Sequence, residues 1–494
     1  MYGTNDQQQY DLMGGKGENN YGRIKSLVVL STDDMQNWTY HGQINVDKIA
    51  TGSWFGVSWA PSIVSREESD GLTHFYMYFS NGGSVGLLTA THPLGPWKDP
   101  LGKSFVNSST PGVGDCSNPF DPGVCIDDEG TGWLAFGGGS INKTGTDAQP
   151  GNARIVKLGS DMKSLASKAS EIRAPYQFEA SELNVIGGKL VYTYCSRWSD
   201  PNASCSMNYM VCDQGTSNPL DTASWRYVGN YVKNPGTFGF GYGNNHTHLH
   251  KYRGTWYIIY HNLKLINASG NTEASGFRSL GINTMSVSES SQKLYSATMN
   301  SNGPSKLQDL DPYRRHSATE MRTGVGVSFA NHPDYAVKKD TLRAVLTDVQ
   351  DGAWVALKSV AFTANGASRF TIRVKGTGSV SLQKNSATPT TANTLGTVTF
   401  SGLKDFTDVS IDLSHTKVRG TVTLYLVFSN PADCQVESWE FEPYDSGSGI
   451  EEMPAADCVE TESVCYNLSG QRICGSRLGQ LAIVRNRLCY ALSR

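Results

Sequence analysis

Apolar residues in the first three hundred positions come in short runs bounded by turns rather than in long amphipathic stretches. Four of these runs occupy positions 75–79, 133–136, 190–194 and 256–260. Each follows a Gly-containing turn or a short polar loop. Apolar runs of this length between turn signals are typical of buried β-strands. The pattern therefore predicts that this part of the chain is built from short strands.

A turn with an apolar residue at its centre recurs between these strands. The central residues are Met35, Leu94, Met162 and Leu220, and a weaker copy lies near Val287. The successive steps are 59, 68, 58 and 67 residues. Short strands repeated at such a period predict a β-propeller of five blades. The first blade is expected to be incomplete at its N-terminal side, because little chain precedes the strand at 26–30.

The pattern changes near residue 311, where a linker is predicted over 311–328. Short strands rich in Val, Thr and Phe follow over 329–443 and predict an antiparallel, jelly-roll-like β-sandwich. A Gly/Ser-rich linker is predicted over 444–459, and residues 460–494 form a short tail, too small for a core of its own. The predicted fold class is all-β: a propeller over 1–310, a sandwich and a short β tail.

Charge and cysteine usage narrow the classes of function. The 42 Lys and Arg residues nearly balance the 45 Asp and Glu residues, which argues against a nucleic-acid-binding surface. No apolar run is long enough to span a membrane. The ten cysteines include no CxxC pair, which disfavours zinc. The close pairs Cys116/Cys125 and Cys195/Cys205 fit both disulfides of an exported protein and buried free thiols.

Two segments carry candidate acids. Asp121 precedes a strand, where it is either a functional carboxylate or the cap of a turn. Glu179 and Glu182 lie three residues apart in an apolar, aromatic stretch. Burial there would raise the pKa of a carboxyl and make it a proton donor, whereas a partly exposed pair would have no such role.

A third segment is rich in histidine. His246, His248 and His250 alternate and would share one face of a strand. This spacing fits a metal site and equally fits one histidine that faces a central pit, with two outside it. Arg278 is a lone cation among small and apolar residues, which fits either the site or an ordinary surface position.

Together these residues resemble glycoside hydrolase family 43, the inverting five-bladed propeller enzymes that act on arabinose- and xylose-containing polysaccharides. The matching segments, in the family's order, are 59–63, 120–122, 178–181, 244–246 and 276–279. The resemblance implies that Glu179 is the general acid and that Asp121 orients it and tunes its pKa. It places Arg278 at the active centre, and Trp59 and His246 among the substrate-binding residues. It implies no required cofactor, with calcium near His246 as an option.

The resemblance also implies a general base that these residues do not supply. In the family the base is an Asp in an Asp-Pro-type motif on the first strand, ahead of the segment that aligns with residues 1–4. Asp6 and Asp11 are the nearest acids, and neither sits in such a motif. The chain is therefore expected to be a weak or inactive hydrolase, either as the truncated product of a longer gene or as a propeller that has lost its base.

The second half of the chain resembles carbohydrate-binding module family 6 over the segments 351–354, 422–428 and 437–441. The resemblance implies that Trp354 and Phe406 are aromatic platforms for sugar rings, with core packing as the alternative for Trp354. Residues 465–473 resemble a sorting domain of secreted bacterial proteins. The protein is thus expected outside the cell, at the bacterial surface or in the periplasm, with its signal segment missing from this chain.

The favoured interpretation is an inverting glycoside hydrolase of the α-L-arabinofuranosidase or β-xylosidase type, involved in xylan degradation. Its partner would be a plant cell-wall polysaccharide or oligosaccharide. Two alternatives remain: a non-catalytic carbohydrate-binding protein, which the missing base favours, and a structural adhesion module.

Overall fold

A computed structural model describes residues 1–416, 418–444, 465–466, 472–473, 481–484 and 487–490. The chain divides into two compact units, Met1–Glu442 and Pro443–Arg494. In the second unit, short antiparallel strands are described at β31 (Cys465–Tyr466), β32 (Arg472–Ile473), β33 (Leu481–Val484) and β34 (Arg487–Tyr490). The first unit holds every residue predicted to take part in the function.

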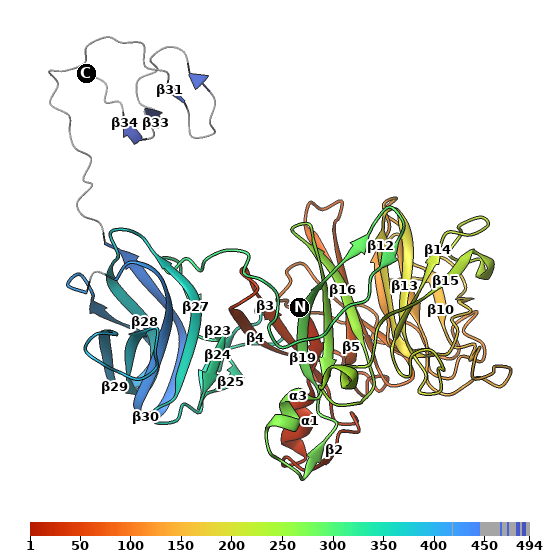
Figure 1. The fold of residues 1–494 in the computed structure, drawn as a ribbon, viewed down its shortest axis with the longest axis horizontal. Helices are drawn as coiled ribbons and strands as arrows, with labels where there is room; N and C mark the ends of the chain where they lie inside the picture. The colour runs from red at the N-terminus through yellow and green to blue at the C-terminus, as the bar shows by residue number, and fades with distance from the viewer. Residues whose placement is uncertain (417, 445–464, 467–471, 474–480, 485–486, 491–494) are drawn as a thin grey trace. The chain divides into compact units, whose positions relative to one another are not determined.

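Five antiparallel sheets follow one another in the first three hundred described residues (Figure 1). Blade I contains β1 (Tyr2–Thr4), β3 (Ser26–Ser31), β4 (Trp38–Asn45) and β23 (Glu320–Met321), and blade II contains β5 (Trp59–Glu67), β6 (Thr73–Ser80) and β7 (Val85–Ala90). Blade III contains β8 (Gly123–Ile126), β9 (Gly132–Phe136), β10 (Arg154–Lys157) and β11 (Ser170–Glu171). Blade IV contains β12 (Gln177–Ile186), β13 (Lys189–Ser196), β14 (Met207–Cys212) and β15 (Trp225–Val232), and blade V contains β16 (Thr247–Tyr252), β17 (Thr255–Asn262) and β19 (Ser279–Met285).

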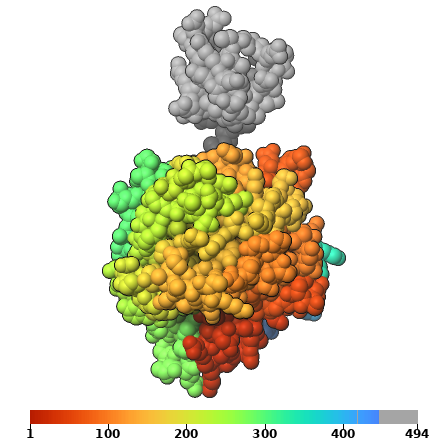
Figure 2. All heavy atoms as spheres, turned by 90° about the vertical axis from the view of Figure 1, so that its right-hand side faces the viewer, coloured from red at the N-terminus to blue at the C-terminus, as the bar shows by residue number. Residues whose placement is uncertain are grey.

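Short elements lie in the loops between these strands. They are α1 (Asp6–Leu12), β2 (Gly17–Glu18), α2 (Val46–Ile49), η1 (Thr222–Ser224), η2 (Pro235–Phe238), α3 (Lys264–Ala268), β18 (Ala274–Ser275), β20 (Val287–Ser288) and β21 (Lys293–Leu294). β2 and β18 pair in parallel, which joins the loop after β1 to the loop before β19. These N-terminal (red) and later (green) segments also lie side by side in Figures 1 and 2.

The repeating turn of the sequence occupies the same position in blades II to V, where it follows the third strand of the sheet. The strands concerned are β7, β10, β14 and β19. In blade I the turn at Met35 follows β3, which is the second strand of that sheet. In the described sheet of blade I, two strands precede the turn. In each of the other four sheets, three strands precede it.

Apolar side chains fill the spaces between neighbouring blades, as the alternation of the strands predicts. One buried cluster joins blades III and IV around Trp133, Tyr192 and Trp225. Another joins blades IV and V around Tyr209 and Ile258. The predicted fold class, a five-bladed propeller followed by a β-sandwich, is confirmed.

The sandwich follows the propeller within the same unit. Its strands are β22 (His316–Ser317), β24 (Thr323–Val325), β25 (Ser328–Asn331), β26 (Ala344–Thr347), β27 (Trp354–Phe362), β28 (Ala367–Lys384), β29 (Thr394–Asp412) and β30 (Gly420–Pro443). They enclose one apolar core that includes Phe370, Phe428 and Trp439.

The segment predicted as a linker, 311–328, contains strands instead. β22 pairs with β30 and β24 pairs with β27, so both belong to the sandwich. β23 pairs with β4 and forms the outer strand of blade I. Strands of two or three residues are too short to show an alternating pattern, which explains why the sequence was interpreted as a linker.

Among the described residues, no helix is long and apolar enough to cross a membrane.

Candidate active site

Glu179 lies at an irregularity near the start of β12, the innermost strand of blade IV. The pairing of β12 with β13 shifts register on both sides of Glu179. Ala180, the next residue, has a left-handed backbone with a φ of 64°. A bulge of this kind bends a strand and redirects its side chains, and bulges are common next to active sites. The predicted general acid thus sits where the backbone departs from regular pairing.

Asp121 holds this bulge from the neighbouring blade. Its carboxylate accepts a hydrogen bond of 2.9 Å from the backbone N–H of Ala180 and one of 3.0 Å from the hydroxyl of Ser80. The Ser80 hydroxyl in turn accepts from the backbone N–H of Asp121, at 2.8 Å. Asp121 is buried and has a left-handed φ of 48°. The structure therefore brings Asp121 and Glu179 together, with Asp121 fixing the backbone beside the acid.

The surroundings of Glu179 favour its protonated form. Burial, and then the negative charge of Asp121, raise the pKa of Glu179 well above its usual value. Arg278 and a hydrogen bond with Asn244 act in the opposite direction but do not outweigh these causes. A carboxyl that keeps its proton near neutral pH is suited to protonate a leaving group.

Arg278 is held rigidly by Asp6, the first residue of α1. The guanidinium donates to the Asp6 carboxylate through Nε at 2.9 Å and Nη2 at 2.6 Å, and the backbone N–H of Arg278 adds a bond of 2.8 Å. Asn19 donates a further bond of 2.8 Å to the same carboxylate. Two-point contact of this kind fixes both the position and the plane of a guanidinium. The structure therefore gives Asp6 a positioning role.

Aromatic rings extend from Arg278 toward blade II. The Arg278 guanidinium lies 4.5 Å from the centre of the Tyr21 ring. Tyr21 meets Trp59 edge to face at 6.3 Å, and the Trp59 indole donates to the Tyr21 carbonyl at 2.9 Å. Burial raises the pKa of the Tyr21 hydroxyl; the charge of Arg278 opposes the rise, and those of Asp6 and Glu179 add to it. Trp59 is thus connected to the site through Tyr21.

The three alternating histidines, His246, His248 and His250, have different surroundings. His246 lies immediately before the strand, where burial lowers its pKa against the opposing charges of Asp121 and Glu182. His248 contacts Glu182 through Nδ1 at 2.6 Å. Burial alone would lower the pKa of His248, but the Glu182 carboxylate outweighs it and the pKa is raised. His250 stacks on His248 at 5.9 Å, farther along the strand.

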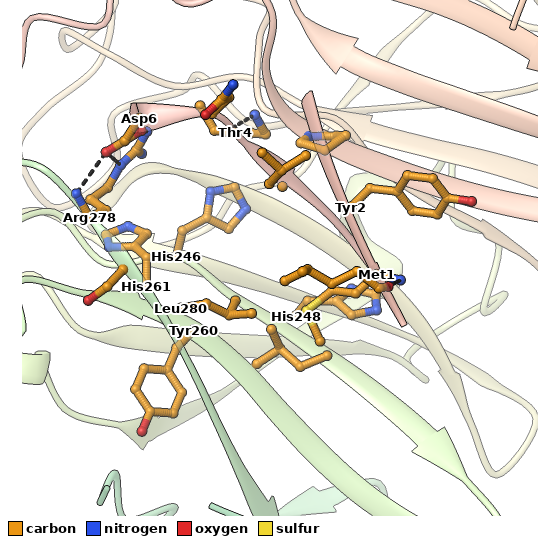
Figure 3. Close-up of a pocket in the computed structure, with 18 of the residues that line it drawn as sticks. Met1, Tyr2, Thr4, Asp6, His246, His248, Tyr260, His261, Arg278 and Leu280 are labelled. Atoms are coloured by element: carbon orange, nitrogen blue, oxygen red, sulfur yellow. Dashed lines mark hydrogen bonds and ion pairs between the residues drawn. The ribbon is translucent and has the colours of Figure 1, made fainter. Parts of the chain in front are cut away.

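A cavity of about 340 Å³ borders the site (Figure 3). Its walls come from β1, β16, β17 and the Arg278 segment, and they include Asp6, Glu182, His246 and His261. Figure 3 shows His246 and His261 next to the Asp6–Arg278 pair. Glu179 and Asp121 are not among the lining residues, whereas Pro122, His246 and Arg278 are.

The described residues contain no group of three or more His, Cys, Asp or Glu side chains arranged to hold a metal ion. The calcium option at His246 has no further support from this arrangement and stays a prediction.

The two aromatic residues predicted to bind sugar on the sandwich lie in different surroundings. Trp354, at the start of β27, is half-buried and meets Tyr425 edge to face at 5.5 Å. Phe406, in β29, packs on His332 at 4.7 Å and lines a polar pocket with Arg373 and Glu437. Their roles as sugar platforms stay predictions.

Sequence reasoning missed two contributors to the site. Tyr21 lies in a loop that carries no recognisable motif, and its contact with Arg278 joins segments far apart in the chain. The partnership of Glu182 with His248 joins different blades. The sequence singled out both members, Glu182 as one of two neighbouring acids and His248 as one of three alternating histidines, but not their contact.

Comparison with known proteins agrees with the geometry. The family model "Glycosyl hydrolases family 43" matches residues 4–290, and the model "Carbohydrate binding module (family 6)" matches residues 317–443. The chain belongs to glycoside hydrolase family 43. This family 43 glycosidase therefore carries a family 6 module as its sandwich.

Two curated relatives of the family 43 chain are named arabinoxylan arabinofuranohydrolase. The one from Paenibacillus polymyxa is 31% identical, over 92% of this chain and 73% of the relative. The one from Bacillus subtilis (strain 168) is 33% identical, over 87% of this chain and 84% of the relative. A crystal structure of a family 43 arabinoxylan arabinofuranohydrolase from Bacillus subtilis, in complex with cellotetraose, superposes with a TM-score of 0.80 at 30% identity. It covers 90% of this chain and 92% of the other.

Replacing Asp121 with Asn is expected to move the alkaline limb of the pH–rate profile to lower pH. The amide still accepts a hydrogen bond from Ala180, but it removes the negative charge that helps to raise the pKa of Glu179. The acid then loses its proton at a lower pH. Rates of arabinose release from arabinoxylan across pH test this, because its sugar leaving group needs the proton. Asp128→Asn, in an exposed turn of the same hairpin, is the control, and an unmoved alkaline limb in Asp121→Asn contradicts the assigned role.

Proposed function

We propose that this glycosidase removes arabinofuranosyl groups from arabinoxylan with inversion of the anomeric centre. The observation that carries the proposal is the half-buried Glu179, raised in pKa and fixed at a bulge by Asp121. Glu179 protonates the glycosidic oxygen as the bond to the sugar breaks. The names of the two curated relatives support arabinoxylan as the substrate.

We further propose that the polypeptide works slowly because no carboxylate that lines the cavity, among the residues the structure describes, is free to activate water. Of the carboxylates that line the cavity within the described residues, Asp6 is bonded to Arg278 and Glu182 to His248. Both carboxylates are thus already engaged by a basic side chain. An inverting hydrolase needs a second carboxylate across from the acid, far enough away to admit a water molecule. General-base help contributes about 10²–10⁴-fold to such a reaction.

The direct test is to incubate the polypeptide with arabinoxylan and to follow the released sugar and its anomeric form by NMR. Slow release of arabinose, first as the inverted anomer, supports the substrate and the stereochemistry. Release of xylose alone, or retention of configuration, contradicts the proposal. Aryl arabinofuranoside and aryl xyloside assayed side by side give the same distinction on simple substrates.

The missing base has its own test, in which a small anion takes its place. Formate is expected to accelerate hydrolysis of an aryl arabinofuranoside, and azide is expected to give the arabinosyl azide of inverted configuration. Sodium chloride at equal ionic strength is the control. A version extended at its N-terminus by an upstream Asp-Pro strand should be faster and insensitive to formate. Robust turnover that neither formate nor the extension changes would show that the 494 residues already hold a base.

A non-catalytic carbohydrate-binding protein is the second candidate, and the pairing of Asp6 with Arg278 and of Glu182 with His248 is the observation that favours it. Oligosaccharide binding without any turnover, also in the presence of formate and in the extended version, would decide for this alternative.

A further inference from the structure

Two cysteines face each other directly behind the acid. Cys195 lies near the end of β13, and in the strand register it is the partner of Glu179. Cys205 lies just before β14 begins. Their Sγ atoms are 3.6 Å apart, and both side chains are fully buried. Among the six cysteines of residues 1–444 this is the only pair of sulfur atoms in contact.

The backbone between the two cysteines is already closed into a tight loop. Ser196 donates from its N–H to the Ser206 carbonyl at 2.8 Å, and Cys205 donates to the Arg197 carbonyl at 3.1 Å. A disulfide has an S–S bond of about 2.0 Å, so the sulfur atoms need to approach by only about 1.5 Å. Side-chain rotation supplies this without reopening the strands.

The loop lies at the catalytic end of blade IV. Because β12 and β13 are antiparallel, the end of β13 and the start of β12 meet at the same edge of the sheet. Within the loop, Trp198 is 48% exposed, and the Arg197 guanidinium lies over the Phe178 ring, next to Glu179 in the chain. A bond across the base of the loop would therefore act on the backbone that presents Trp198.

We propose that Cys195 and Cys205 form a reversible disulfide when the protein meets a peroxide oxidant, and that this bond locks the loop 197–204 beside the acid. The Cys205 thiolate attacks hydrogen peroxide, which gives a sulfenic acid and hydroxide. The Cys195 thiol then attacks the sulfenic sulfur, the S–S bond forms, and water leaves. Two thiols are oxidised and one peroxide is reduced to two water molecules, once the hydroxide takes up the proton of the Cys205 thiol.

The pKa shifts of Cys195 and Cys205 indicate which thiol attacks the peroxide and which then attacks the sulfenic acid. The hydrogen bond from Cys195 lowers the pKa of the Cys205 thiol. Burial raises the pKa of Cys195 well above its usual value. The thiolate is the reactive form, so Cys205 attacks and Cys195 resolves. The bond also removes a titratable thiol from the neighbourhood of Glu179, since the charge of Cys205 is one of the causes that raise the pKa of Glu179.

The other described cysteines provide the contrast. Within residues 1–444 they are Cys116, Cys125, Cys212 and Cys434, all of them buried. Cys212 lies in the same blade, and its sulfur contacts the Ser217 carbonyl. The sequence alternative of a Cys116/Cys125 disulfide is not formed in this structure, where both are free thiols.

The experiment treats the folded, fully reduced 494-residue protein with hydrogen peroxide, blocks the remaining thiols and maps the product with trypsin. The bond would join the peptide 190–197 to the peptide 198–226, with a combined mass lower by two hydrogen atoms. Dithiothreitol should separate them. Because 198–226 also contains Cys212, further cleavage after Tyr209 identifies the linked cysteine.

Cys205→Ser should abolish the linked peptide, and Cys212→Ser, the matched control, should retain it. The oxidised wild type should also unfold at a temperature higher by about a few degrees than the reduced protein, because the bond restricts the unfolded chain. A peptide linked through Cys212, oxidation of Cys205 only to sulfinic acid, or no loss of thiols from the folded wild type would each overturn the proposal.

Discussion

Glu179→Gln is expected to slow the release of arabinose from arabinoxylan by about 10²–10⁴-fold. The amide keeps the size of the side chain but has no acidic proton to give to the departing oxygen. The loss should depend on the leaving group: large for a sugar alcohol, and much smaller for a nitrophenolate, which departs without protonation. Rates for the two substrates, each relative to wild type, measure this difference.

Glu179→Gln is expected to lower activity but to raise stability relative to wild type as the pH increases. The direction of the stability change follows from the raised pKa of Glu179. A carboxyl whose pKa is higher in the folded than in the unfolded protein stabilises the fold fully only below its unfolded pKa. That contribution is lost as the pH rises through the folded pKa. Glu179→Gln cannot ionise, so its melting temperature relative to wild type should rise between pH 5 and pH 8.

Glu129→Gln, in an exposed turn of blade III, is the matched control for both measurements and should behave as wild type. If Glu179→Gln slows the nitrophenyl and polysaccharide substrates by the same factor, proton donation is not its role. If its melting temperature follows that of wild type at every pH, Glu179 is not an acid with a raised pKa.

The propeller could be predicted from the sequence because its repeat unit is local. Each blade brings the same turn after the same strand, so Leu94, Met162 and Leu220 mark the blades without any knowledge of contacts. Blade I is the exception, since Met35 follows the second strand of its sheet. Its outer strand β23 comes from residues beyond the propeller, which no local repeat could indicate.

The site was predictable only as far as single segments carry its chemistry. The acidic, apolar stretch around Glu179 indicated a proton donor, and burial by other blades then raises its pKa as expected. What the sequence could not show are the partnerships that decide each role. Whether Asp6 is a free carboxylate depends on Arg278, which is 272 residues away in the chain. Both cysteines of the pair behind Glu179 were visible, but only the fold shows that their sulfur atoms meet.

Asp6→Ala is expected to lower the free energy of unfolding by about 3 kcal/mol, the largest stability effect among the substitutions considered. The carboxylate is buried and accepts four hydrogen bonds, three of them from Arg278. Its removal leaves the guanidinium and the Asn19 amide without their acceptor, while the Tyr21 ring covers the cation on one side. Denaturant unfolding of the variant and of wild type measures the difference.

Asp11→Ala separates this effect from a general loss of charge in α1. Asp11 lies in the same helix but is exposed and accepts only from Gln7, so its replacement should change stability by less than about 0.5 kcal/mol. Asp6→Ala should also leave arabinoxylan hydrolysis further impaired even with formate present, because Arg278 is no longer held in place beside the proposed acid. Hydrolysis by Asp6→Ala that formate restores to the wild-type level would instead show that Asp6 itself serves as the base, and that its bonds to Arg278 give way when substrate binds.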